Sequence, residues 1–222
     1  GFIGLRIPSA VIHSDRVSMD TFIERQLRLS GSSDLSNTPS FSYSIKTIPN
    51  YHYLPISFGQ NVDISKWFGI PKPENTNTKL ILDFSRTSFS MAIDIAPNGR
   101  YHLLDHELAK YDLNDLIYVN NISFGRRLMV IVESPLDAPT LTAIIKKMVE
   151  QAEVTKDDFI LAAQCDFTIV NFDKEVLNFN AGNPLQYAMD YLSRPFTSDD
   201  YGVPIRFSAA YVYDNRVFEN QY

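Results

Sequence analysis

The chain has 222 residues, of which 45% are hydrophobic and 13% aromatic, so it can bury a substantial core. Its formal net charge of −6 argues against nucleic acid as the main partner, because binding to a phosphate backbone needs a basic face. A single cysteine, Cys165, excludes an internal disulfide and a cysteine-based metal site, and the absence of a run of about 18 apolar residues excludes a transmembrane helix.

The first part of the chain combines one short helical pattern with strong alternation. Residues 1–40 form an N-terminal extension, in which 17–29 favour a short helix. Residues 41–48 alternate and are rich in β-branched and aromatic side chains, which predicts a strand. Residues 54–70 also alternate between apolar and polar side chains, and they lead into a polar segment with two prolines at 71–78.

The rest of the chain alternates long strands with helices. Apolar runs rich in β-branched and aromatic residues predict four long strands, at 79–95, 117–134, 165–172 and 203–215. Helical spacing and start signals predict helices at 139–152, 155–164 and 183–194, and a short helix or covering loop at 106–116. Long strands separated by helices indicate the α+β class, with a mostly antiparallel four-stranded sheet covered by helices.

The sequence offers no positive case for catalysis, a cofactor or a metal. His102 and His106 stand four residues apart, but they lack the HExxH order and an evident third ligand, so surface histidines are the favoured interpretation. Cys165 lies at a strand start with no histidine nearby in the sequence, which favours a buried, inert thiol. We therefore expect a protein that is not an enzyme and has no catalytic, cofactor or metal residues.

One strand carries an unusual break in its middle, formed by Ser123, Phe124, Gly125, Arg126 and Arg127. Glycine inside a strand often marks a bulge or a kink, so we expect the sheet to bend here. Adjacent residues of a strand point to opposite faces. At most one of the two arginines therefore needs a buried acidic partner, and an arginine at this place can bond to backbone instead.

Three stretches together resemble the cholesterol-dependent (thiol-activated) cytolysins, within the membrane attack complex/perforin-like pore-forming superfamily. They are FSRTSFSMAIDI at 84–95, NNISFGRRLMVIVES at 120–134 and YGVPIRFSAAYVYDNRVF at 201–218. The resemblance covers about residues 41–220. It implies a long, bent, four-stranded sheet in a core domain at 41–222, with helical clusters at about 54–79 and 136–164.

The resemblance also implies a function and a location. In that family each cluster unfurls into a membrane-spanning β-hairpin when the protein oligomerises, so this chain is expected to be a pore-forming-toxin-like protein. Its partners would be a lipid membrane and other copies or related cytolysin subunits, and it would be secreted or lie on a bacterial cell surface. The implied hairpin residues on the apolar side of the first cluster are Ile56, Phe58, Val62, Ile64, Phe68 and Ile70. The implied inter-subunit strand contacts are Tyr51, Tyr53 and Phe167.

Three departures from the family pattern keep an alternative open. The sequence stops where the family's C-terminal cholesterol-binding domain would begin, so cholesterol binding is not implied. The family's Gly-Gly pair would fall near Asp173 and Lys174, where no glycine stands. The adjacent pair Lys146–Lys147 suits a helix and breaks strand alternation. The alternative is a non-lytic surface-binding or structural protein that reuses the fold.

Overall fold

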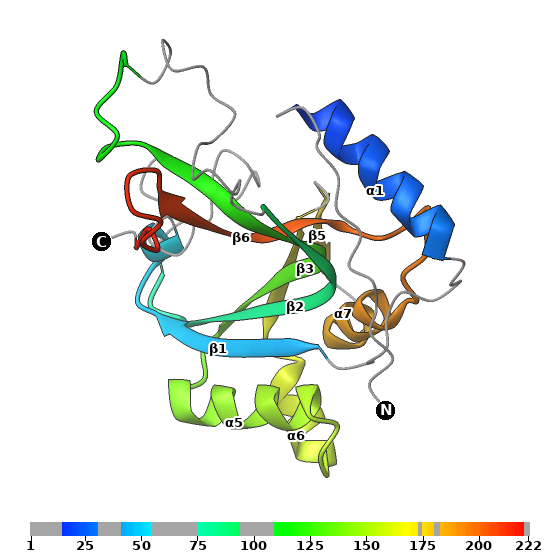
Figure 1. Ribbon diagram of the computed structural model, residues 1–222. Coiled ribbons are helices and arrows are strands. Elements are labelled where there is room, and N and C mark those ends of the chain that lie inside the picture. The colour runs from blue at the N-terminus through cyan, green and yellow to red at the C-terminus, as the bar shows by residue number, and fades with distance from the viewer. Residues whose placement is uncertain are drawn as a thin grey trace, which may run out of the picture.

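A computed structural model describes residues 15–30, 41–54, 75–93, 109–172, 175–179 and 183–219. Its helices are α1 (Arg16–Ser30), α5 (Ala138–Val149), α6 (Lys156–Ala162) and α7 (Pro184–Ser193), with a short 3-10 helix, η1, at Tyr51–Tyr53. Its strands are β1 (Ser42–Ile48), β2 (Thr78–Ala92), β3 (Ile117–Ser134), β4 (Asp166–Asn171), β5 (Glu175–Phe179) and β6 (Val203–Tyr211). In Figure 1, α5 and α6 lie at one end of the sheet and α1 lies at the other.

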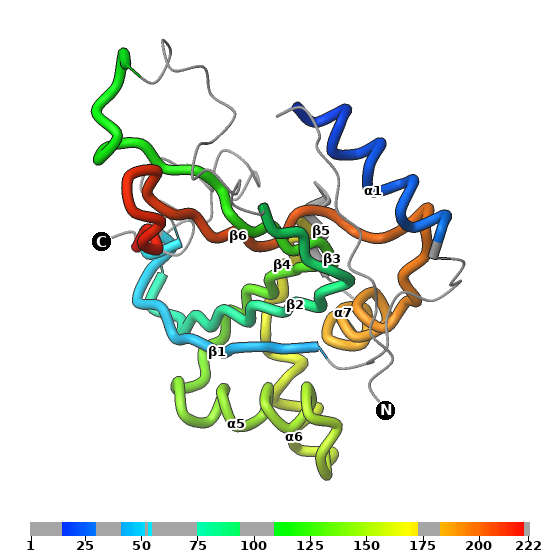
Figure 2. Tube along the Cα trace, viewed as in Figure 1, coloured from blue at the N-terminus to red at the C-terminus, as the bar shows by residue number. Residues whose placement is uncertain are grey.

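The strands form one six-stranded sheet in which every pairing is antiparallel. The order is β1-β2-β3-β4-β5, and β6 pairs with β3. β4 pairs with the C-terminal half of β3, beginning at Leu128, and β6 pairs with the N-terminal half, up to Gly125. β3 therefore runs through both halves of the sheet, and the halves meet at Gly125; Figure 2 traces this path.

The structure confirms the α+β class and a curved antiparallel sheet, but the expected number of four strands was too low. The strand predicted at 41–48 joins the sheet as edge strand β1, and β5 was not predicted at all. β4 has only six residues, so it is not a long strand. In the segment 106–116, the described residues 109–116 form turns and no helix.

The main core lies between one face of the sheet and the helices. We call this the core face; it carries Leu80, Leu82 and Phe84 of β2, Leu128, Val130 and Val132 of β3, and Phe167 and Ile169 of β4. The opposite face carries a smaller cluster that includes Ile81, Met129 and Ile131. Where β2 and β3 are buried on both faces, at 80–82 and 128–132, their sequences are continuous apolar runs.

The helices that cover the core face begin at side-chain caps. Asp137 accepts a hydrogen bond from the backbone N–H of Thr140 at the start of α5, and Asn183 does the same for Gln186 at the start of α7. In α5, Leu141, Ile144, Ile145 and Val149 form one buried stripe at helical spacing. α7 ends at Ser193, two residues before Pro195, which cannot continue a helix.

Candidate functional site: the sheet bend and the helical pair

Gly125 marks the bend because two backbone segments approach it closely. A Cβ atom at Gly125 would lie 2.0 Å from the carbonyl oxygen of Arg86 on β2. Gly202, just before β6, has a φ of +87°, and a Cβ there would lie 2.1 Å from the carbonyl oxygen of Gly125. Both neighbouring pairings shift register at this level, between Thr87 and Phe89 on one side and between Ser123 and Phe124 on the other. Bulges on both sides bend the strand.

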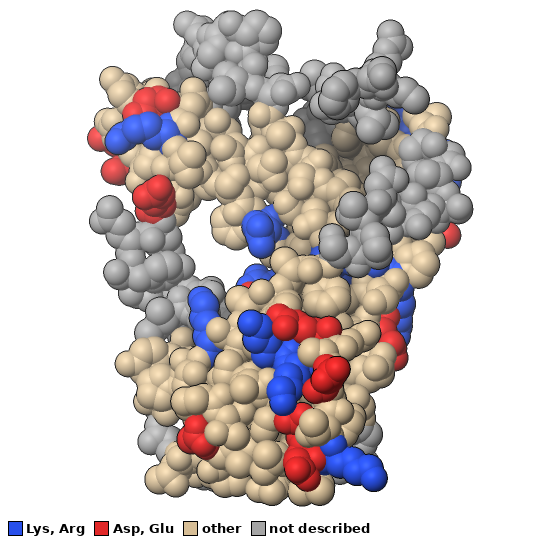
Figure 3. Space-filling model, turned by 90° about the horizontal axis from the view of Figure 1, so that it is seen from below, with Lys and Arg blue, Asp and Glu red and all other residues tan. Residues whose placement is uncertain are grey.

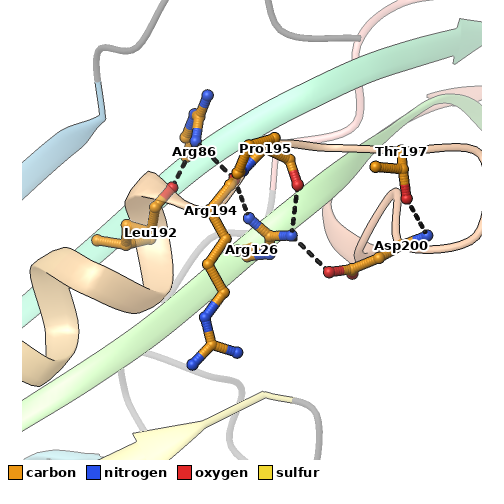
Figure 4. Close-up of polar contacts among 7 residues, drawn as sticks. All are labelled: Arg86, Arg126, Leu192, Arg194, Pro195, Thr197 and Asp200. Atoms are coloured by element: carbon orange, nitrogen blue, oxygen red, sulfur yellow. Dashed lines mark hydrogen bonds and ion pairs between the residues drawn. The ribbon is translucent and has the colours of Figure 1, made fainter. Parts of the chain in front are cut away.

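Next to the bend, two buried arginines hold the end of helix α7. Arg86 and Arg126 face each other across β2 and β3, and both are at most 4% exposed. The Arg86 guanidinium donates to the carbonyl oxygens of Leu192 (2.6 Å) and Arg194 (3.0 Å). Figure 4 shows both guanidinium groups directed at this segment. The last carbonyl groups of a helix carry partial negative charge, which offsets the two like charges.

Arg126 adds contacts beyond the helix end. It donates to the carbonyl oxygens of Arg194 and Pro195, and it forms an ion pair with Asp200 at 2.6 Å. Its guanidinium also lies 4.5 Å from the centre of the Phe196 ring, a cation–π distance. One side chain thus ties the middle of β3 to the connection between α7 and β6.

Arg127 points to the face opposite to that of Arg126, as expected for adjacent residues of a strand. Its Nε and Nη2 groups donate to the Asp83 carboxylate, at 2.9 and 2.7 Å, and its guanidinium lies over the Phe172 ring. Each arginine therefore has an acidic partner, but neither acid is buried, because Asp200 and Asp83 are 61% and 34% exposed. Bonding to backbone, which the sequence interpretation allowed at this place, is seen for Arg126 and also for Arg127, whose Nη1 group donates to the Ile205 carbonyl oxygen at 3.4 Å.

The helical pair α5–α6 occupies the connection between β3 and β4. Thr155 is the N-cap of α6. Its hydroxyl accepts from the backbone N–H of Asp158, and the Asp158 carboxylate accepts from the backbone N–H of Thr155, which completes a capping box. Lys147 of α5 donates to the same carboxylate at 3.2 Å. Asp158 thus connects the two helices.

We expect the capping carboxylate to make stability depend on pH. The hydrogen bonds from Thr155, followed by Lys147, hold the pKa of Asp158 below its usual value. A carboxyl group with a lowered folded-state pKa stabilises the fold at neutral pH and loses that contribution as the pH falls through the folded-state pKa. Asp158→Asn should therefore lower the melting temperature at pH 7, and the difference from the parent should shrink as the pH falls below about 4, the ordinary carboxyl value, and on through the lowered folded-state pKa. The control is Asp157→Asn, which should change the melting temperature less; equal effects would contradict the capping role.

Helix α5 is also tethered to the edge strand β1 of the sheet. The Tyr43 hydroxyl of β1 donates to the Glu150 carboxylate at the end of α5, at 2.6 Å. This hydrogen bond, and to a lesser degree burial, raises the pKa of Tyr43 to about 12. Release of α5 from the sheet would therefore also free a side chain of the edge strand.

A buried polar cluster lies on the opposite face, where β2 begins and β3 ends. Lys79 and Glu133 are register partners and are at most 4% exposed. The Glu133 carboxylate accepts from Tyr51 and from the side-chain amides of Asn75 and Asn77, and Lys79 donates to the carbonyl oxygens of Asn75 and Asn77. Burial and the bond to Glu133 raise the pKa of Tyr51. Charged residues inside the apolar runs KLIL and MVIVES were the only sequence signal for this cluster.

The structure separates the three residues expected at inter-subunit contacts. Tyr51 and Tyr53 lie in η1, and Tyr51 faces Glu133 on the opposite face of the sheet. Phe167 lies in β4, is 8% exposed, and packs in the core on the core face. In this conformation Phe167 is covered, so contact with another subunit would require rearrangement around β4.

Of the other residues singled out in the sequence, only some lie within the described part of the chain. The six apolar residues Ile56 to Ile70 lie outside the described residues, as do His102 and His106. Cys165 is half-buried just before β4, and burial raises the pKa of its thiol. Within the described ranges no group of three His, Cys, Asp or Glu side chains is placed to hold a metal ion. Nor does any helix in the part of the chain described here have the length and apolar character to cross a membrane.

The two lateral edges of the sheet differ. Among the described strands, none pairs with the outer edge of β1, whose residues Ser42, Ser44 and Lys46 are exposed. A polar edge strand with lysine is a usual protection against unwanted pairing. At the other side, β5 covers β4 through five residue pairs, from Phe167–Phe179 to Asn171–Glu175. The inner strand β4 is thus covered by a strand of only five residues.

Solved structures of other proteins share this architecture, although sequence comparison finds no match. No family model and no curated protein matches the sequence. The structure is similar to pneumolysin, with a TM-score of 0.72 and 14% identity over 92% of this chain and 47% of the toxin. It is similar to suilysin from Streptococcus suis, with a TM-score of 0.70 and 18% identity over 96% and 51%. It is also similar to a non-hemolytic pneumolysin from Streptococcus pneumoniae, with a TM-score of 0.68 and 13% identity over 91% and 46%.

These similarities establish the fold. The chain has a cholesterol-dependent-cytolysin-like fold, which confirms the resemblance seen in the sequence. It spans about half the length of the toxins it matches. Because one of these matches is described as non-hemolytic, the fold by itself does not establish lysis.

Proposed function

We propose that this chain is the core of a pore-forming-toxin-like protein that oligomerises edge to edge and inserts β-hairpins into a target membrane. The observation that carries this proposal is the connectivity of the sheet. α5 and α6 join β3 to β4, and β3 and β4 are antiparallel neighbours. Unfolding the two helices into a hairpin would lengthen both strands without changing the order of the sheet.

The connection is also long enough. Residues 135–165 provide 31 residues between the end of β3 and the start of β4. Two strands joined by a short tip would have about 14 residues each, and a membrane-spanning strand needs about 9–11. Residues 49–77 join β1 to β2, also antiparallel neighbours, so a first hairpin is proposed there on the same grounds.

The unequal edges supply a mode of assembly. If β5 leaves β4, the exposed edge of β4 can pair with the outer edge of β1 on the next copy. Such a head-to-tail contact uses two different surfaces, and it closes into a ring when the rotation between copies allows. The core at 41–222, preceded by the extension 1–40, would thus act with other copies or with related cytolysin subunits. The protein would work outside the cell, secreted or at a bacterial surface, without enzymatic activity.

A second candidate function, a non-lytic surface protein, is favoured by two prolines. Pro135 and Pro139 fall in the segment that would extend β3, and proline cannot donate a hydrogen bond to a strand ladder. The end of the molecule that carries α5 and α6 also shows acidic and basic side chains interspersed (Figure 3). This view shows no single-sign basic patch that would attract an anionic membrane.

Electron microscopy and dye release on the same liposomes separate the two functions. Rings together with release of an encapsulated dye support the pore-forming function. Rings without release support the non-lytic function. Neither rings nor release, across vesicles with and without sterol and anionic lipid, would overturn the assembly proposal itself.

A further inference from the structure

The resting register of the sheet determines which side chains of the second hairpin would face lipid. β3 and β4 pair in one continuous register, from Leu128–Asn171 to Glu133–Asp166. If the same register continues through 135–165, the tip falls at Val149 and Glu150. Because successive residues of a strand alternate between faces, every residue of the segment is then assigned to a face.

The two faces differ in composition over the ten register pairs from Leu136–Ala163 to Ile145–Val154, five pairs on each face. The core face continues through Leu136, Ala138, Thr140, Thr142, Ile144, Thr155, Asp157, Phe159, Leu161 and Ala163. The opposite face continues through Asp137, Pro139, Leu141, Ala143, Ile145, Val154, Lys156, Asp158, Ile160 and Ala162. One charged residue, Asp157, lies on the core-face side, whereas the opposite side has three: Asp137, Lys156 and Asp158.

We propose that, in the inserted state, the core-face side of residues 135–165 contacts the acyl chains of the lipid and the other side contacts water. This inference rests on the proposed pore-forming function. Charges on the lipid side of a spanning strand are unfavourable, most of all near the bilayer midplane. Of the two assignments that the register allows, this one places the fewer charges in lipid.

The adjacent lysines fit this arrangement, although they seemed to break strand alternation. In the continued register Lys146 stands opposite Glu153, on the same face, and Lys147 falls on the other face. Both lysines lie beyond the ten core-face positions, close to the tip, where the hairpin emerges into water. Lys146 and Glu153 would then form a cross-strand ion pair.

The residues that α5 buries in the helical form are not the residues of the proposed lipid side. The amphipathicity of the helix therefore does not predict which side chains would face lipid in the hairpin. The buried residues of α5 are Leu141, Ile144, Ile145 and Val149. Ile144 belongs to the proposed lipid side, whereas Leu141 and Ile145 belong to the water side. On α6 the exposed neighbours Phe159 and Ile160 likewise separate.

A pair of neighbouring substitutions tests the assignment. Thr142→Lys places a charge on the lipid side, and Ala143→Lys places it on the water side, one residue away on the same helix. Thr142 is half-buried and Ala143 is exposed in the resting molecule. At equal numbers of rings, Thr142→Lys should reduce dye release about 30-fold or more. Ala143→Lys should leave release within about two-fold of the parent, because its charge stays in water. Equal losses, or a larger loss for Ala143→Lys, would overturn the assignment.

A fluorescence measurement gives a readout that does not depend on how well each lysine variant inserts. In a Cys165→Ser background, a polarity-sensitive dye is attached at Thr142→Cys or Ala163→Cys, and at Ala143→Cys or Lys156→Cys as matched positions. Lipid-borne quenchers should quench only the first pair. The reverse pattern would overturn the lipid-side assignment while leaving hairpin insertion intact. A watery environment at all four positions in assembled rings would overturn insertion of this segment, and failure to form rings would overturn the proposed function on which the inference depends.

Discussion

Replacing Gly125 with alanine should lower the free energy of unfolding by about 3 kcal/mol or more, since it forces overpacking against backbone. The added Cβ would lie 2.0 Å from the Arg86 carbonyl oxygen and 2.9 Å from the Thr87 Cα. Backbone atoms cannot move aside as the end of a side chain can. Either β2 and β3 separate, or the bulge at Thr87 rearranges. Urea denaturation followed by circular dichroism measures the change.

The matched control for Gly125→Ala is Ser123→Ala on the same strand. The Ser123 hydroxyl lies 2.9 Å from the Ser90 hydroxyl at an exposed position, so its loss should change the free energy of unfolding by less than about 1 kcal/mol. Comparable values for the two variants would show that the close approach at Gly125 does not constrain the sheet.

The second large effect is expected from Arg126→Ala, which should destabilise the protein by about 3 kcal/mol, because a buried donor is lost and a cavity is left. The substitution removes a side chain that is 2% exposed, leaves the Arg194 and Pro195 carbonyl groups without this donor, and empties space beside Phe196. Arg86 would remain, but its guanidinium is directed to Leu192 and Arg194 and does not replace the ion pair with Asp200. Thermal and urea unfolding measure the loss.

Two further variants show whether the shape of the guanidinium matters at position 126. Arg126→Lys keeps the charge but cannot reach several acceptors at once in one plane, so it should lose an intermediate amount. Arg206→Ala removes an exposed arginine on β6 and should change stability by no more than about 0.5 kcal/mol. If Arg126→Ala behaves like Arg206→Ala, Arg126 does not hold the end of α7.

Local patterns in the sequence predicted most of the regular elements. β3 was expected at 117–134 and spans Ile117–Ser134, because a long run of alternating and β-branched residues has no competing signal. The helix starts at Thr155 and Asn183 were predicted because a cap is a contact between residues three apart. Such features are encoded within a few neighbouring positions.

Features that depend on distant partners were not predictable. The acceptors of Arg126 lie 68 to 74 positions further along the chain, so no local pattern names them. Gly125 indicated a bend in the sequence. The reason that no side chain fits at this position is the close approach of backbone near Arg86 and Gly202, which only the fold brings next to Gly125. β5 was missed because five residues carry little strand signal, and its place is fixed by pairing with β4.

The central claim is that β5 leaves β4, so that β1 of the next copy can pair with the freed edge of β4. A disulfide that holds β5 on β4 is the most direct test. Thr168 and Asn178 are register partners across β4 and β5. Partner Cα atoms in an antiparallel pair lie about 4.5–5.5 Å apart, within the range a disulfide spans. Thr168→Cys with Asn178→Cys, in a Cys165→Ser background, locks β5 onto β4 when oxidised.

The measurement is the number of rings per liposome area, counted by electron microscopy before and after reduction. Each single-cysteine variant, treated in the same way, controls for effects of the substitutions. The account predicts almost no rings with the oxidised double variant, and recovery to the level of the single variants once the disulfide is reduced. Equal numbers of rings in the oxidised and reduced states would contradict it, because the chain would then assemble with β4 still covered.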